Sequence, residues 1–184
     1  MRPLAMLWRN HVTESGSSVT YDRIEPRQRT KAMRVGYAAG CFDLFHVGHL
    51  NILRQARGQC DYLIAGVVSD EMLELTKGAR PVVPLNERLE IVRHISFVDQ
   101  AVPEVLEDKM DTWRELEFNV FFKGDDWRGT ERGQRLENQF ATVGVEVVYF
   151  PYTMHTSSTA LRRALEALSR PGPVARGAQS GSLD

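Results

Sequence analysis

The sequence has few cysteines, no long apolar run and almost no net charge, and each absence argues against a class of protein. Cys41 and Cys60 are the only cysteines among 184 residues, too few for a disulfide framework, so we expect a reduced, cytoplasmic protein. No segment approaches the roughly 18 apolar residues that a membrane-spanning helix needs, so we expect no membrane partner. The net charge of −1 gives no overall field for nucleic acid, so we expect no nucleic-acid partner either.

The two ends of the chain differ in composition from the middle. Residues 1–32 lack a periodic apolar pattern, and residues 171–184 are rich in Pro, Gly and Ser. Such segments bury too little apolar surface to offset the entropy of ordering. We therefore predict a poorly ordered N-terminal extension at 1–32, one domain at 33–170 and a flexible C-terminal tail at 171–184. Met33 directly precedes the first predicted strand, which leaves the true start of translation open.

Between the ends, segments with strand character alternate with segments of helical period. Strands are predicted at 34–40, 61–69, 98–103, 119–124 and 145–151. Helices are predicted at 49–56, 70–75, 85–95, 108–116, 130–143 and 157–168. In the last helix, four apolar residues share one face: Leu161, Ala164, Leu165 and Leu168. This alternation predicts an α/β fold, a Rossmann-like open parallel sheet of about five strands with helices on both faces. Ligands of such sheets bind beyond the carboxyl ends of the strands.

The segment GCFDLFHVGHLNIL, residues 40–53, places two histidines three positions apart at the start of a predicted helix. It lacks the G-x-G-x-x-G fingerprint of dinucleotide-binding proteins. At this spacing His46 and His49 can point into one pocket, where imidazoles and the N–H groups of a helix start can donate to phosphate. Two other interpretations stay open. One is a pair of zinc ligands, for which H-x-x-H without further ligands nearby is weak; the other is a pair of structural histidines.

The same segment resembles the H-x-G-H signature of the nucleotidyltransferase superfamily, and three later segments resemble family motifs in the same order. KGARPVVPLNER, residues 77–88, resembles the lysine-bearing loop and the arginine helix that follows it. KGDDW, residues 123–127, resembles the G-D-D-W of bacterial glycerol-3-phosphate cytidylyltransferases, and YTMHTSST, residues 152–159, resembles their R-T-x-G-x-S-T-T loop. The resemblance covers about residues 34–165. It implies transfer of CMP from CTP to a phosphorylated polyol such as glycerol 3-phosphate, with release of pyrophosphate.

This chemistry needs positioning and charge stabilisation rather than a covalent nucleophile. The resemblance implies that His46, His49 and Lys77 are catalytic, and that Lys77 also binds the acceptor together with Asp43 and Lys109. It implies nucleotide contacts from several segments: Gly40, Cys41, Phe42, Gly48, Arg80, Arg88, Asp126, Tyr152, Thr153, His155, Thr156, Ser157, Ser158 and Thr159. We expect Mg²⁺ to arrive with the nucleoside triphosphate, no metal ion held by the protein itself, and a homodimer.

Three of these residues have plainer interpretations. Asp43 can orient the loop that contains it instead of contacting substrate. Lys109 can lie on the solvated face of an amphipathic helix. Arg88 can form a surface ion pair with Glu87 or Glu90.

Four positions depart from the family pattern. Tyr152 replaces an arginine, His155 a glycine and Cys41 a threonine, and Ser96 stands where close relatives carry a further arginine. Loss of two cations from a triphosphate site would weaken nucleotide binding or indicate a different acceptor, although the imidazole of His155 can restore some donor capacity. Three alternatives therefore stay open: an adenylyltransferase acting on a sugar phosphate, a nucleotide-binding regulator that has lost turnover, and a zinc-binding module.

Overall fold

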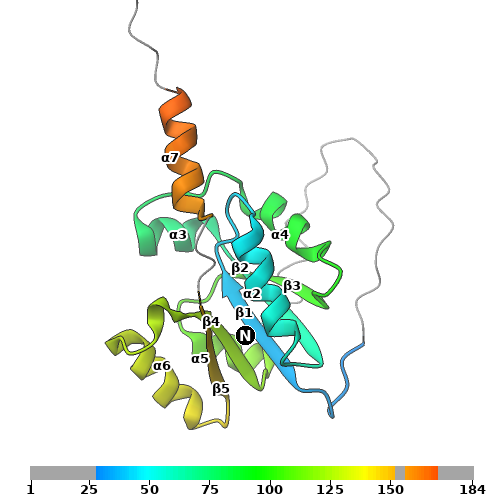
Figure 1. Cartoon of the computed structure of the whole chain (residues 1–184). Coiled ribbons are helices and arrows are strands. Elements are labelled where there is room, and N and C mark those ends of the chain that lie inside the picture. The colour runs from blue at the N-terminus through cyan, green and yellow to red at the C-terminus, as the bar shows by residue number, and fades with distance from the viewer. Residues whose placement is uncertain (1–27, 152–155, 170–184) are drawn as a thin grey trace, which may run out of the picture.

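The computed structural model describes residues 28–151 and 156–169, and five parallel strands form one sheet in this part of the chain (Figure 1). The strands are β1 (Val35–Gly40), β2 (Tyr62–Val68), β3 (Gln100–Glu104), β4 (Val120–Gly124) and β5 (Glu146–Phe150). Their order across the sheet is β3-β2-β1-β4-β5. The predicted Rossmann-like parallel sheet is confirmed, and each strand lies within about two residues of its predicted bounds.

Six α-helices connect and flank the strands within the described residues. They are α2 (Val47–Arg57), α3 (Asp70–Lys77), α4 (Leu85–Arg93), α5 (Lys109–Leu116), α6 (Glu131–Ala141) and α7 (Ser158–Ser169), with a short 3₁₀ helix, η2 (Asp125–Trp127), after β4. Polar side chains fix several starts: Ser69 accepts from the Met72 N–H at α3, and Thr130 from the Gly133 N–H at α6. Within residues 28–151 and 156–169, no helix has the length and apolarity to cross a bilayer.

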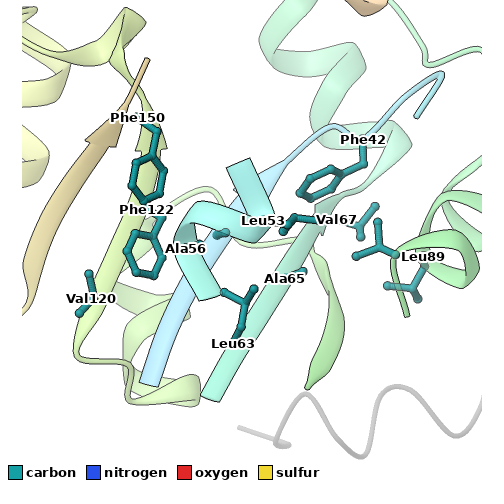
Figure 2. Close-up of a cluster of buried hydrophobic side chains, with 12 residues drawn as sticks. Phe42, Leu53, Ala56, Leu63, Ala65, Val67, Leu89, Val120, Phe122 and Phe150 are labelled. Atoms are coloured by element: carbon teal, nitrogen blue, oxygen red, sulfur yellow. The ribbon is translucent and has the colours of Figure 1, made fainter. Parts of the chain in front are cut away.

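Alternate residues of the central strands point to opposite faces of the sheet, and both faces are buried. On one face Leu63, Ala65 and Val67 of β2 pack with Leu53 of α2 and Leu89 of α4 (Figure 2). On the other face a second cluster packs strand residues against α5 and α6: Val35, Tyr37, Tyr62, Ile64, Phe118, Phe121, Leu136, Phe140 and Val145, with Met110, Trp113 and Leu116. Because helices cover both faces, the ends of the strands are the parts of the sheet that stay open to ligands.

Part of the predicted N-terminal extension contacts the domain. Residues 28–32 belong to the described part, and Arg29 donates hydrogen bonds to the backbone carbonyls of Leu116 and Glu117 at 2.5 and 2.7 Å. The chain therefore contacts the domain before residue 33. The rest of the predicted extension, residues 1–27, and the predicted tail at 171–184 lie outside the described residues.

The apolar face predicted for the last helix is only partly covered by the described residues. Leu161, Leu165 and Leu168 of α7 are 36%, 44% and 83% exposed. Figure 1 shows the reason: α7 begins near the carboxyl ends of the strands and extends away from the sheet instead of packing on a face.

Candidate active site

The candidate site lies at the carboxyl ends of β1 and β4, where the winding of the sheet changes direction. The two strands are parallel neighbours, with Ala38 opposite Phe122. In the sheet, β2 lies on one side of β1 and β4 on the other. The loop after β1 and η2 after β4 therefore both begin at the carboxyl ends of neighbouring parallel strands. Such a switch point is where open α/β sheets bind ligands. The start of α7 lies at this edge too, because the Ser158 hydroxyl donates to the Asp43 carbonyl at 2.7 Å.

His46 and His49 come together at the start of α2. His46 caps the helix: its Nδ1 accepts a hydrogen bond from the Gly48 N–H at 3.0 Å. The proton of the neutral ring is therefore on Nε2, which lies 3.4 Å from the Ser158 hydroxyl. The two imidazoles stack with their centroids 4.0 Å apart. The cap also explains Gly48, because a Cβ there would lie 2.7 Å from Cε1 of His46.

Both imidazoles are neutral near physiological pH. Burial lowers the pKa of His46. The pKa of His49 is lowered to about 3, chiefly by burial; the neighbouring His46 and Lys77 also lower it, while the Asp43 carboxylate acts in the opposite direction. Nδ1 of His49 is buried and has no hydrogen-bond partner among the described residues. Two neutral rings side by side, one with a free buried nitrogen, can each offer a hydrogen bond to a phosphate without adding a fixed charge.

The carboxylate of Asp43 points inward and ties three segments together. It is 1% exposed and accepts hydrogen bonds from the N–H groups of Val82 and Val83 at 2.9–3.0 Å and from Arg162 at 2.7 Å. Burial alone would raise the pKa of Asp43, but the N–H groups of Val83 and Val82 and the Arg162 guanidinium together hold it below its ordinary value. These contacts fit the alternative in which Asp43 orients its loop, and the expected acceptor contact of Asp43 stays a prediction.

Arg162 belongs to this arrangement and was missed in the sequence. Its Nη1 donates to the Arg80 carbonyl at 3.1 Å while its Nη2 pairs with Asp43. It therefore joins α7 to the loop after β1 and to the loop after α3. The signal that could have found it is its position four residues after Ser158, which places both side chains on one face of α7.

Arg88 is buried, whereas the plainer interpretation placed it in a surface ion pair. Its side chain has 0% exposure. The guanidinium donates to three backbone carbonyls and one carboxylate, those of Val83, Cys41, Val68 and Asp70. The expected ion pair with Glu87 or Glu90 is therefore wrong, because the partner is Asp70 at 2.5 Å. With four of its five donors engaged inside the protein, Arg88 supports the loop after β1, and its expected nucleotide contact stays a prediction.

The other residues expected at the nucleotide follow β1, β4 and α3. Gly40 ends β1, and the half-buried Cys41 and the buried Phe42 follow it, with Phe42 in the left-handed region at a φ of 52°. Asp126 is exposed in η2. Arg80 is exposed too and pairs with Glu74 at 2.8 Å.

Two of the four hydroxyl residues at the start of α7 form structural hydrogen bonds. Ser157 caps the helix by accepting from the Ala160 N–H at 3.1 Å, and Ser158 contacts the loop after β1. Thr156 is half-buried and Thr159 is exposed. The remaining expected contacts lie outside the described residues: Tyr152, Thr153 and His155.

Three lysines border the same edge. Lys77 is the last residue of α3 and is exposed. Lys109 starts α5, where its ammonium lies 3.5 Å from Glu104 and donates to the Leu106 carbonyl at 3.1 Å. Its side chain is only 20% exposed, so the alternative of a solvated helix face is wrong. Lys123, near the end of β4, was not singled out in the sequence, although it begins the KGDDW segment.

The donor set gives no support to the zinc-binding alternative. Within residues 28–151 and 156–169, no three His, Cys, Asp or Glu side chains are grouped so that they could hold a metal ion. Structural zinc sites need four such ligands and catalytic ones three.

The fold is that of an α/β protein with a five-stranded parallel sheet, and the candidate site lies at the carboxyl ends of its central strands. A family model described as cytidylyltransferase-like matches residues 37–164, which is more than half of the chain, so this protein belongs to the cytidylyltransferase-like family.

Curated relatives agree with this assignment. Glycerol-3-phosphate cytidylyltransferase of Bacillus spizizenii is 32% identical over 130 residues, covering 70% of this chain and 95% of that enzyme. Ethanolamine-phosphate cytidylyltransferase of Arabidopsis thaliana is 41% identical over 104 residues, covering 54% of this chain and 24% of that protein. The bifunctional protein HldE of Acidiphilium cryptum is 36% identical over 102 residues, covering 55% of this chain. This chain spans 24% and 21% of the length of the last two proteins.

Solved structures share the fold. The lipopolysaccharide core biosynthesis protein of Thermoplasma volcanium superposes with a TM-score of 0.57 at 25% identity, covering 67% of this chain and 99% of that one. Pantoate-beta-alanine ligase of Francisella tularensis superposes with a TM-score of 0.56 at 14% identity, covering 74% of this chain and 68% of that one, a likeness of fold alone.

Proposed function

We propose that this protein transfers CMP from CTP to a phosphorylated polyol such as glycerol 3-phosphate and releases pyrophosphate. The observation that carries the proposal is the stacked, neutral pair of His46 and His49 at a helix start, in a member of the cytidylyltransferase-like family. The choice of acceptor is supported by the Bacillus spizizenii relative, of which this chain covers 95%.

In the proposed reaction an oxygen of the acceptor phosphate attacks the α-phosphorus of CTP, and the bond from that phosphorus to the pyrophosphate oxygen breaks. Negative charge grows on the oxygens around the α-phosphorus and on the leaving group. The Nε2–H of His46 and an N–H of His49 donate to these oxygens. Lys77 supplies a mobile positive charge between the two anionic substrates, which would otherwise repel each other. Neither histidine has to accept a proton, because the attacking phosphate oxygen is already ionised.

We propose that Mg²⁺ accompanies the triphosphate, and the residues present fit this. Asp43 is occupied by its own partners and Asp126 is the exposed carboxylate of η2, so the nucleotide oxygens would hold the ion chiefly themselves. When bound, the ion neutralises phosphate charge. We also propose that the protein is a homodimer, which light scattering would test against a monomer of 20.9 kDa.

The test is a matrix of four nucleoside triphosphates against phosphorylated polyols and sugars, with pyrophosphate release as the readout. We expect turnover with CTP and a polyol phosphate. Turnover with ATP and a sugar phosphate instead would identify the adenylyltransferase alternative. Nucleotide binding without turnover for any pair would identify the regulator.

A further inference from the structure

Lys123 has an unusual environment for a lysine. It lies at the carboxyl end of β4, next to Gly124, and is half-buried. Its ammonium sits 4.4 Å from the centre of the Trp127 ring. Its ammonium has no hydrogen bond or ion pair with any residue in the described ranges 28–151 and 156–169. A half-buried ammonium without an anionic partner is unfavourable, and binding of an anion would relieve the cost.

Other cations surround Lys123. The pKa of Lys123 is lowered to about 8, chiefly by burial; Lys109, Lys77 and Arg132 also lower it, while Asp126 acts in the opposite direction. The ammonium of Lys123 therefore has repulsive Coulombic interactions with those of Lys77 in α3 and Lys109 in α5. Like charges repel, so the grouping costs free energy unless an anion with more than one charge binds among them.

Lys109 is anchored within this group, and Lys123 is free to respond. Lys109 lies 3.5 Å from Glu104, a buried carboxylate that also accepts hydrogen bonds from the hydroxyls of Tyr37 and Thr112. Glu104 is 2% exposed, so this anchor is built into the interior. The fixed lysine defines the position of a bound anion, and the unpaired one completes its coordination.

The aromatic residue beside the lysines is not available to a cationic ligand. Trp127 carries the Lys123 ammonium over its ring, and the Arg132 guanidinium also lies 4.4 Å from the ring centre. Recognition of an ammonium head group uses an open aromatic face, with no competing cations. Here the ring already contacts two protein cations, and a third would be repelled.

We propose that Lys123, with Lys77 and Lys109, binds the phosphate of the acceptor, and that this lysine cluster selects acceptors without an ammonium group. The inference rests on the proposed function for the identity of the ligand as an acceptor. It favours polyol or sugar phosphates and disfavours acceptors that carry an ammonium beside their phosphate.

The first test measures binding without turnover, by calorimetry with inorganic phosphate and with glycerol 3-phosphate. Lys123→Met keeps the length of the side chain and removes the charge, and we expect about 10- to 100-fold weaker binding of both anions, as for loss of a hydrogen bond to a charged group. Lys123→Arg should retain most of the affinity. Lys31→Met, an exposed lysine before β1, is the matched control and should bind as the unmodified protein does. Equal affinity in Lys123→Met and the control would overturn the proposal.

The second test isolates the ammonium group with two ligands that differ by it, ethyl phosphate and ethanolamine phosphate. We expect ethyl phosphate to bind more tightly, and the ratio of the two affinities to shrink in Lys123→Met. Affinity for ethyl phosphate should also fall as pH rises through about 8, where Lys123 loses its proton, and this fall should be absent in both Lys123→Met and Lys123→Arg. A ratio that does not change in Lys123→Met would refute selection by the cluster.

These outcomes separate the inference from the proposed function. Binding of phosphate that depends on Lys123, in a protein that turns over no pair of the substrate matrix, would retain the lysine site and refute the transferase proposal. If the protein turns over CTP and glycerol 3-phosphate, and Lys123→Met leaves the KM for the acceptor unchanged, the transferase proposal is retained and the lysine site is refuted.

Discussion

Asp43 and Arg162, 119 positions apart in the chain, form an ion pair in which Nη2 lies 2.7 Å from Oδ2. Because Asp43 is fixed by the Val82 and Val83 N–H groups, Arg162 holds the start of α7 against the loop that carries His46. The proposed triphosphate contacts near α7 therefore depend on a residue that need not touch the nucleotide.

Arg162→Gln should reduce kcat/KM for the nucleotide by about 10- to 100-fold, since displacing a catalytic group by about 1 Å has effects of that size. The variant should keep its fold, because Arg162 lies outside the core. Steady-state kinetics together with a melting curve would check this. Arg163→Gln is the control, an exposed neighbour on α7; if both variants behave alike, the ion pair has no role in the site.

His46→Ala and His49→Ala should each lower kcat by about 100- to 1000-fold, because each removes a positioned donor to a developing charge. His94→Ala, in an exposed residue at the end of α4, serves as the control. Near-normal rates in both site variants would mean that the histidines are structural.

The imidazole of His49 should not titrate between about pH 5 and 8 in the free protein. Its pKa is lowered to about 3, chiefly by burial, so it gains a proton only well below this range. NMR shifts of the ring as a function of pH would measure it. A bound triphosphate should raise the pKa, because negative charge favours the protonated ring. A midpoint near 6.5 without nucleotide would show that the ring is exposed to solvent.

Arg88→Met should destabilise the protein by about 3–5 kcal/mol, the usual effect of removing one partner from a buried ion pair. Urea unfolding would measure it, with Arg93→Met, an exposed residue of the same helix, as the control. The experiment also decides between the two roles of Arg88. If Arg88→Met has an unchanged free energy of unfolding but binds nucleotide weakly, the result would support the phosphate contact that the resemblance implied.

Strand and helix periodicity was enough to predict the fold, because a buried parallel strand and an amphipathic helix each leave a local pattern. The β1 loop and its two histidines could be placed for the same reason, since strand, glycine-containing turn and helix follow one another directly. Boundaries moved where side chains intervene: α2 starts two residues before its predicted start, because the ring of His46 caps it.

The partners of charged residues could not be predicted in this way. Arg88 reaches Asp70, and Arg162 reaches Asp43, across distances in the chain that no periodicity records. The sequence gives each of these residues an ordinary position on an amphipathic helix. Only the packing of α4 and α7 at the sheet edge decides whether the guanidinium meets solvent, a phosphate or a buried carboxylate.

The strand order also has a consequence for how the protein folds. β1, β2 and β3 follow one another in the chain and can assemble early, but the other side of β1 is completed only when β4 arrives, pairing Gly36 with Val120. Until then the central strand has one row of backbone groups unpaired and the apolar side chains of β4 and β5 have no sheet to join. Such non-local parallel pairing slows folding and prolongs the lifetime of an aggregation-prone intermediate. Refolding yield should therefore fall with protein concentration well before native stability becomes limiting.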